Sequence, residues 1–478
     1  MQKYDIVVLG AGPGGYVAAI RAAQLGKAVA IVEQAAAGGV CLNVGCIPTK
    51  TLVRNAEILH LAGIGAKRGI RIETDGVDIE KAIAAKDAVV RQLTGGVEML
   101  LKGNGVEIYK GKGIATMQKT ILVEGEKPVE IGYDKLIIAT GSRPATLPIP
   151  GADGDYVADS TDLLSTKKIP AHLIIIGGGV VGCEFASIFR SFGSQVTVIE
   201  MLPRLLANMD SEVSAALQTS FRRQKIDVKL ETAVTGMEKT DGGVRVLVKK
   251  GEEESTIEGD LVLVSVGRKA NTAGLEALDL ATDRGFVKTD DDFATSAPDV
   301  YAIGDVTGRF MLAHAASAMG VQVVETICEG GVPAGLGAVP GCVFTAPEIG
   351  AVGLTEAQAR DAYGEILVGR FPLAASGKAL AMGETEGMYK LIAETKTEKI
   401  VGAHLVGAGA TELVSTVAAY MAMGATLKDV TKTIFAHPTL AECIMEAAHD
   451  AEGCCVHLPP RSKKQGTRKG LFCQTDFV

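Results

Sequence analysis

The chain is poor in aromatic residues: it has no Trp, 9 Tyr and 12 Phe among 478 residues. It has no apolar run near the roughly 20 residues that a membrane-spanning helix needs. Its net charge of -8 also lacks the strong positive sign of a nucleic-acid-binding surface. These absences argue against both protein classes. The 58 glycines and the hydrophobic content of 47% are instead typical of an α/β protein with glycine-rich loops.

The first apolar run, at residues 5–9, begins almost at Met1 and leaves no room for a cleavable targeting segment. The 9 cysteines are an odd number and are scattered, as expected in a reducing compartment. We therefore expect a cytoplasmic protein of about three domains. A basic stretch after Pro459 and Pro460 predicts a disordered tail.

Two cysteines, Cys41 and Cys46, lie five positions apart in segment 38–50. In a regular α-helix, residues at this spacing point to different faces, so a disulfide between them needs an irregular backbone, which Gly45 permits. A disulfide in a distorted turn is easy to reduce, as a redox catalyst requires. The alternative is two buried cysteines that act as small hydrophobes. Intracellular pairs of this kind are more often catalytic or metal-binding, so the sequence favours redox chemistry.

One sequence unit occurs twice, 167 residues apart. Each copy has an apolar run typical of a buried parallel strand, then G-x-G-x-x-G at the start of a helix. A second strand follows and ends in an acid 23 residues after the first glycine: Glu33 after Gly10, and Glu200 after Gly177. The glycines let a pyrophosphate approach the helix N-terminus, and the acid accepts hydrogen bonds from a ribose diol. Two matching copies predict two bound dinucleotides, with the chemistry passing between them.

Two further segments carry candidate polar groups. Segment 295–305 reads as a strand that ends in Gly304-Asp305, which places a carboxylate at the edge where open α/β sheets bind ligands. Near the C-terminus, His437 precedes a proline and Glu442 follows five residues later. A histidine oriented by a carboxylate is a proton acceptor suited to neutral pH. A lone histidine before proline is more often a cap or a packing residue.

Together these segments resemble the flavin-dependent pyridine nucleotide-disulfide oxidoreductases, over residues 1 to about 458. The resemblance implies an α/β fold with two Rossmann-like dinucleotide-binding domains, for FAD and NAD, and a C-terminal α+β dimerisation domain. The implied parts are an FAD-binding domain at 1–143, an NAD-binding domain at 144–271, a central domain completing the FAD site at 272–342, an interface domain at 343–455 and a tail at 456–478.

The resemblance also assigns the cofactor sites. Met201 follows Glu200, where NADP-preferring relatives place arginines that meet a 2′-phosphate, so NAD is favoured; Arg204 is the nearby cation that argues the other way. The residues implied for FAD are Gly10, Gly12, Gly14, Gly15, Glu33, Lys50, Thr140, Gly141, Ser142, Asp305 and Ala313, and those implied for NAD are Gly177, Gly179, Gly182, Glu200 and Gly267.

Lys50 and Glu184 gain a catalytic role only from the resemblance, which pairs them near the flavin ring. From the residues alone, Lys50 is equally well a surface cation, and Glu184 an acid that favours the first turn of its helix.

By the same resemblance, Cys41 exchanges with the substrate, Cys46 lies against the flavin, and His437 with Glu442 is a base delivered by the other subunit of a homodimer. The implied activity is the NAD+-dependent oxidation of a dihydrolipoyl group through a Cys41–Cys46 redox disulfide. That group would be carried on a lysine of a carrier protein, such as a 2-oxoacid dehydrogenase core or a glycine-cleavage carrier. No resident metal is expected.

Two alternatives remain open: a related disulfide or mercuric-ion reductase of the same superfamily, and a non-catalytic flavoprotein that serves as a docking subunit. The second predicts loss of a cysteine, the histidine or its acid, and all four are present. The vicinal Cys454 and Cys455 bear on the first alternative, the related reductase. They are either a redox or metal-binding pair, which would support it, or a chance pair at a strand. The other histidines show no catalytic constellation and are expected to be structural: His60, His172, His314, His404, His449 and His457.

Overall fold

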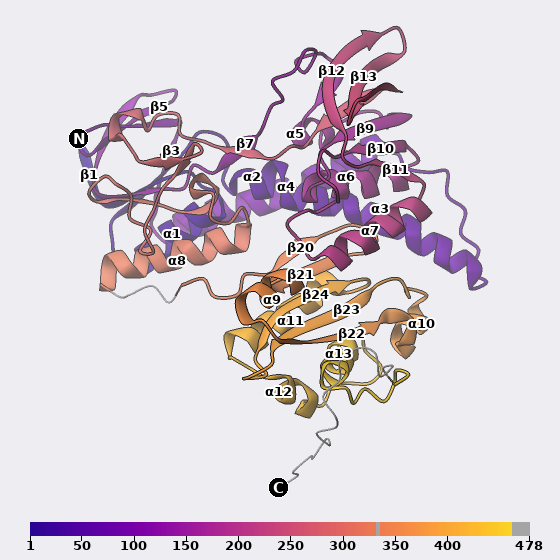
Figure 1. The fold of residues 1–478 in the computed structure, drawn as a ribbon. Coiled ribbons are helices and arrows are strands. Elements are labelled where there is room, and N and C mark those ends of the chain that lie inside the picture. Colours follow the sequence, from indigo (N-terminus) through magenta and orange to yellow (C-terminus); the bar gives the residue numbers. More distant parts are fainter. Residues whose placement is uncertain (331–334, 461–478) are drawn as a thin grey trace.

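The computed structural model describes residues 1–330 and 335–460. Two α/β units lie side by side, and a third unit with an antiparallel sheet lies below them (Figure 1). The tail was expected at 456–478, and its residues 461–478 lie outside the described residues.

The first unit is built on a seven-stranded sheet with the order β3-β2-β1-β6-β5-β4, which β19 joins by pairing with β6. β1 pairs in parallel with β2 and β6, so the N-terminal strand lies inside the sheet. The segment near residue 300 thus returns to a sheet begun at the N-terminus. Its strands are β1 (Gln2–Leu9), β2 (Val29–Glu33), β3 (Glu107–Lys110), β4 (Lys112–Ala115), β5 (Thr120–Glu124), β6 (Val129–Ile138) and β19 (Val300–Ala302), and its helices are α1 (Pro13–Gln24), α2 (Gly39–Val44), α3 (Cys46–Lys67), α4 (Ile79–Gly103) and α8 (Ala313–Glu329).

The second unit repeats this plan on a parallel sheet with the order β11-β10-β9-β15-β8. α6 follows β9 as α1 follows β1, and both helices are followed by a glycine with positive φ, Gly26 (+78°) and Gly193 (+104°). The elements are β8 (Val157–Ala158), β9 (His172–Ile176), β10 (Gln195–Ile199), β11 (Ile226–Lys229), β15 (Leu261–Val264), α5 (Ser160–Leu163), α6 (Val180–Ser191) and α7 (Ser211–Arg223), with an antiparallel sheet of β12 (Ala233–Thr240), β13 (Gly243–Lys250) and β14 (Glu253–Gly259).

Two antiparallel strands, β7 and β16, pair where the chain crosses between the first and second units. This crossing puts the end of β6 close to the segment that leaves β15. The connecting elements are β7 (Ser142–Pro144), β16 (Arg268–Ala270), β17 (Thr282–Asp283), β18 (Phe286–Val287), η1 (Glu276–Leu278) and η2 (Gly304–Thr307).

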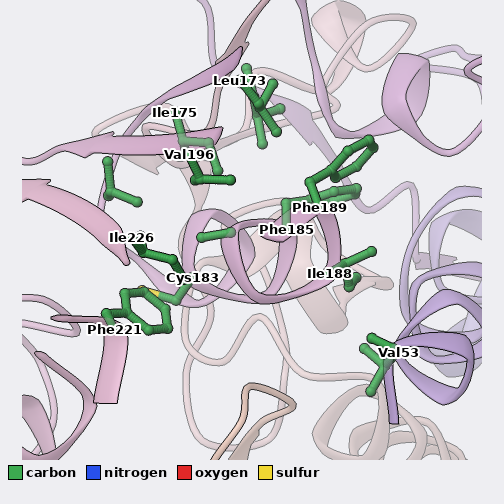
Figure 2. Close-up of a cluster of buried hydrophobic side chains, with 14 of the residues drawn as sticks. Val53, Leu173, Ile175, Cys183, Phe185, Ile188, Phe189, Val196, Phe221 and Ile226 are labelled. Atoms are coloured by element: carbon green, nitrogen blue, oxygen red, sulfur yellow. The ribbon is translucent and has the colours of Figure 1, made fainter. Parts of the chain in front are cut away.

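The core of the second unit is arranged around α6 (Figure 2). Cys183, Phe185, Ile188 and Phe189 are each at most 1% exposed and pack with side chains of β9 and β10. Val53 of α3 belongs to the same cluster, so this core also holds the helix that begins at the second cysteine of the pair. Full burial of each large apolar side chain stabilises the fold by about 1.5–3 kcal/mol.

The third unit is an antiparallel sheet with the order β20-β21-β24-β23-β22. α13 packs directly on β22, because a Cβ at Gly369 would lie 1.8 Å from the carbonyl oxygen of Ala447. The elements are β20 (Gly341–Val343), β21 (Ile349–Gly353), β22 (Ile366–Pro372), β23 (Met388–Glu394), β24 (Ile400–Val406), α9 (Glu356–Tyr363), η3 (Leu373–Ala375), α10 (Gly377–Met382), α11 (Ala410–Ala422), α12 (Leu427–Lys432) and α13 (Glu442–Glu452).

The expected fold class is confirmed: two dinucleotide-type parallel arrangements are followed by an α+β unit. Within residues 1–330 and 335–460, none of the helices combines the length and the apolarity that a membrane span requires.

A buried ion-pair network joins the second and third units. Lys390 of β23 is 1% exposed, and its Nζ lies 3.0 Å from Asp210 Oδ1, 2.8 Å from Glu356 Oε2 and 3.4 Å from Glu212 Oε2. Burial alone would raise the pKa of Asp210, but the Glu356 amide and the Lys390 ammonium hold it below its usual range. The ammonium and the carboxylates therefore depend on one another to remain charged in the interior.

Replacing Lys390 by Met should lower the free energy of unfolding by about 3–5 kcal/mol, because Asp210 then loses its cation while it stays buried. The matched control is Lys239→Met, which removes an exposed lysine from a surface pair with Asp155. Urea unfolding of the two variants measures the difference. An equal effect of both substitutions would contradict the structural role of the network.

Candidate functional site

The two G-x-G-x-x-G loops have the same geometry. The first glycine of each has positive φ, +97° at Gly10 and +113° at Gly177, which disfavours any residue with a side chain. The last glycines of the two loops are Gly15 and Gly182. A Cβ at Gly15 would lie 1.9 Å from the carbonyl oxygen of Gly10, and a Cβ at Gly182 would lie 2.0 Å from the carbonyl oxygen of Gly177. Each helix therefore starts directly against the end of its strand.

The two predicted acids are also held in one way. Glu33 accepts the amide of Ala11 at 2.7 Å, and Glu200 accepts that of Gly178 at 2.6 Å. The other carboxylate oxygen of each acid accepts the amide of the residue two positions after that acid, at 2.8 Å in both copies. This residue is Ala35 for Glu33 and Leu202 for Glu200. These bonds fix each acid beside its loop and leave lone pairs for a ribose diol.

The loops fit two dinucleotides. Gly12 and Gly179 are the N-caps of α1 and α6, and neither helix has a side-chain cap. The nearest atom to a Cβ at Gly12 is 3.9 Å away, and nothing lies within 4 Å of one at Gly179. The first amides of both helices thus open onto space, as the binding of a pyrophosphate requires.

Three further predicted FAD residues, Thr140, Ser142 and Asp305, lie close to the paired strands β7 and β16. Ser142 Oγ donates to Asp305 Oδ2 at 2.5 Å and accepts from Arg268 Nε at 2.6 Å. Thr140 Oγ1 donates to the carbonyl oxygen of Asn271 at 2.6 Å. The sequence prediction did not name Arg268 or Asn271, because no local sequence pattern marks these contacts.

The predicted residues on α1 and α8 pack the two helices together. A Cβ at Gly14 would lie 3.0 Å from the carbonyl oxygen of Ala316. Ala313 is the first residue of α8, and the neighbouring His314 ring meets the carbonyl oxygen of Pro340 at 2.7 Å. The start of α8 would therefore offer main-chain groups to a ligand, rather than the imidazole of His314.

The backbone around the cysteine pair is irregular, as the sequence predicts. α2 ends at Val44 and α3 begins at Cys46, with Gly45 between them. A Cβ at Gly45 would lie 2.9 Å from the carbonyl oxygen of Val40. Both cysteines are partly buried, and both are free thiols in the structure.

The two thiols of this pair differ in acidity. The hydrogen bond to Cys46 and burial raise the pKa of Cys41 well above its usual range. The hydrogen bond from Cys41, followed by the charge of Lys50, lowers the pKa of Cys46 to about 7 against the opposing effect of burial. Cys46 also begins α3, where a helix N-terminus stabilises a thiolate. Of the two thiols, Cys46 is therefore the more acidic.

Lys50 and Glu184 meet across two units. Lys50 Nζ lies 2.9 Å from each carboxylate oxygen of Glu184, which is 4% exposed on α6. Glu184 Oε1 also accepts the amide of Phe344 at 3.0 Å, and Lys50 Nζ lies 4.5 Å from the centre of the Phe344 ring. Because Lys50 is one turn after Cys46, this pair holds a cation close to the thiolate. Phe344 was not expected from the sequence.

His437 and Glu442 also form a pair. His437 Nδ1 donates to Glu442 Oε1 at 2.9 Å, and the amide of Thr439 donates to the other carboxylate oxygen at 2.8 Å. Burial alone would raise the pKa of Glu442, but these two donors hold it below its usual range. The carboxylate thus fixes Nδ1 as the donor and leaves Nε2 as a proton acceptor on a side chain that is 79% exposed.

Within one chain, the helix that follows His437 is far from the helix that carries Cys41. α13 lies in the lower unit and α2 in the upper part of the molecule (Figure 1). Among the described residues, no hydrogen bond or ion pair joins His437 to Cys41 or Cys46.

Comparison with known proteins identifies the family. Residues 4–320 match the family model described as "Pyridine nucleotide-disulphide oxidoreductase", and residues 339–448 match the dimerisation domain of that family. The chain belongs to the pyridine nucleotide-disulphide oxidoreductases. Members of this family use FAD and NAD, the two cofactors that the family resemblance implied.

Similar members of the family share nearly the whole chain. Dihydrolipoyl dehydrogenase of Thermus scotoductus is 42% identical over 96% of this chain and 99% of its own, and that of Geobacillus stearothermophilus is 39% identical over 95% and 97%. Among solved structures, a Cu(II) complex of the HOCl-induced flavoprotein disulfide reductase RclA from Escherichia coli is similar, with 31% identity and a TM-score of 0.84 over 94% of this chain and 99% of that one.

In the reduced, flavin-containing protein, the Cys46 thiolate should form with a midpoint near pH 7. Lys50→Met should move this midpoint to higher pH, because it removes the cation and leaves Glu184 unpaired. The exposed substitution Lys81→Met is the control. The ultraviolet absorbance of the thiolate, measured against Cys46→Ser, reports the titration. An unshifted midpoint in Lys50→Met would disprove the electrostatic role of this lysine.

Proposed function

We propose that the protein oxidises the dihydrolipoyl group of a carrier protein with NAD+, as a homodimer in the cytoplasm. The observation that carries this proposal is the geometry of the cysteine pair: Gly45 breaks the helix between Cys41 and Cys46, and Lys50, held by Glu184, places a cation one turn after Cys46. A pair of this kind accepts a substrate thiolate at one sulfur and releases a stable thiolate at the other.

The reaction of the oxidised pair follows from these residues. His437 Nε2 accepts a proton from one substrate thiol, and the resulting thiolate attacks Cys41 Sγ. The Cys41–Cys46 bond breaks, and Cys46 leaves as a thiolate that Lys50 and the N-terminus of α3 stabilise. The second substrate thiol then displaces Cys41, which takes up a proton, and the substrate leaves as a cyclic disulfide.

The substrate has now lost two electrons and the cysteine pair has gained them. When bound, FAD supplies the remaining chemistry, the transfer of these two electrons as a hydride to NAD+. The two glycine loops hold the two cofactors, and the crossing of β7 and β16 keeps the units that carry them in one orientation.

A second copy of the chain would supply the base. His437 is exposed, and α13, which follows it, lies in a different unit from α2, which carries Cys41 (Figure 1). Ile434, in the same loop, is 96% exposed, which is unusual for a large apolar side chain without a partner. The match of residues 339–448 to a dimerisation domain supports a dimer in which each loop completes the other chain's site.

The preference for NAD+ rests on Glu200. This acid would repel a 2′-phosphate. Arg204 is the nearby cation that argued for NADP+. Its Nη2 donates to the carbonyl oxygen of Ala207 at 2.7 Å, and this hydrogen bond engages it within its own loop.

Steady-state rates with dihydrolipoamide test the activity. We expect turnover with NAD+ and a kcat/KM at least about 100-fold lower with NADP+, because of the repulsion by Glu200. Lipoylated carrier proteins should be oxidised as well. Faster reduction of glutathione disulfide or of a metal ion than oxidation of dihydrolipoamide would favour a related reductase, and no turnover at all would favour a docking subunit.

Cys41→Ser should lower kcat with dihydrolipoamide by at least about 1000-fold, because no disulfide can then form. Its flavin content should be unchanged. The matched control is Cys328→Ser, a partly buried cysteine on α8 outside the pair, which should retain activity. Full activity of Cys41→Ser would overturn the proposed reaction.

A further inference from the structure

The second cysteine pair, Cys454 and Cys455, follows α13 and does not lie in a strand, contrary to the sequence expectation. Gly453 has positive φ (+77°), its amide donates to the carbonyl oxygen of Asp450 at 3.0 Å, and the amide of Cys454 donates to that of His449 at 2.9 Å. These two bonds define a Schellman motif, in which the residue after the glycine folds back over the last helical turn.

In most such motifs the two side chains that meet are apolar. Here they are Cys454 and His449, with Glu452 between them. Cys454 Sγ lies 3.5 Å from His449 Nδ1 and 3.8 Å from Glu452 Oε2, and the three ligand atoms all lie within 4.8 Å of one another. A thiol, an imidazole and a carboxylate therefore converge on one point, and all three are partly buried.

The separations match those of metal ligands. A tetrahedral zinc ion with bonds of about 2.3 Å to sulfur and about 2.0–2.1 Å to nitrogen or oxygen holds neighbouring ligand atoms about 3.5 Å apart. The two distances from Cys454 Sγ are close to this value, and the third pair of atoms lies within 4.8 Å, so the side chains would draw together around an ion. The Schellman motif at the end of α13 brings these side chains together without an ion.

The neighbouring cysteine belongs to a different group. Cys455 Sγ donates to Glu446 Oε2 at 3.1 Å, and His457 Nδ1 donates to the other oxygen of Glu446 at 2.7 Å. The two adjacent thiols thus face different acids, which argues against one site made by the vicinal pair.

We propose that His449 Nδ1, Glu452 and Cys454 Sγ bind Zn2+ at the C-terminal end of α13. Cys454 loses its proton to solvent when the Zn–S bond forms. The three protein ligands leave a fourth position for water or for a donor from another molecule. The ion would close the end of the helix whose first residue, Glu442, orients His437.

The test uses the tag-free, flavin-containing dimer with Cys41→Ser and Cys46→Ser, so that the active-site pair cannot bind the metal. After reduction by a phosphine, added Co2+ should produce the absorption bands of a tetrahedral cobalt–thiolate site in the red part of the visible spectrum. One ion should bind per chain, and Zn2+ should displace the Co2+. Cys454→Ser should weaken Zn2+ binding by at least about 100-fold, since changes to outer partners of metal sites already cost 10–100-fold. His449→Gln should weaken it comparably.

Cys455→Ser is the matched control and should bind Zn2+ as tightly as the parent protein. Flavin content and the circular dichroism spectrum check that each variant is folded. The proposal is wrong if the parent protein gives no cobalt signal, if Cys454→Ser binds normally, or if Cys455→Ser loses binding as fully as Cys454→Ser, which would indicate a vicinal dithiol site.

Discussion

The contact between Lys50 and Glu184 is the interaction on which the geometry of the cysteine pair depends. Glu184 is almost fully buried and accepts hydrogen bonds from Lys50 on α3 and from the amide of Phe344, while it belongs to α6 itself. One carboxylate thereby joins the unit that carries the cysteines, the unit with the second glycine loop and the start of the antiparallel unit. A buried carboxylate of this kind is stable only while its donors stay in place. It therefore holds the cation near Cys46 and links the three units at one point.

This arrangement also explains how two chemically identical thiols acquire different roles. Cys41 lies on α2 and Cys46 at the start of α3, and the break at Gly45 separates the two helices. The hydrogen bond from Cys41 and the charge of Lys50 lower the pKa of Cys46, which also begins a helix, so Cys46 is the more acidic thiol. In the proposed reaction, the duplicated loops hold the two cofactors, and the base comes from the loop before α13 of the other chain.

Much of this could be predicted from the sequence, because the relevant signals are local. The glycine loops and the acids 23 residues further on follow from backbone sterics and strand length, and the structure shows both copies with nearly identical contacts. His437 and Glu442 are close in sequence, so their hydrogen bond is also a local feature.

Contacts between distant residues left weaker signals. Lys50 and Glu184 are 134 positions apart and gained a partner only from the family resemblance. Arg268, Asn271 and the buried Lys390 have no local pattern that marks them, because tertiary packing alone decides their partners. The segment at Cys454 was misread as a strand, although Gly453 at the end of a helical pattern is the usual signal of a helix cap.

The central claim is that two chains together form each dithiol-oxidising site. Co-expression of Cys41→Ser chains with His437→Gln chains tests it most directly, since each variant alone should be inactive with dihydrolipoamide. In a mixed dimer, one site combines the intact cysteines of one chain with the intact histidine of the other. With random assembly, about a quarter of the wild-type activity should return. No recovery in dimers verified to be mixed would contradict a shared site.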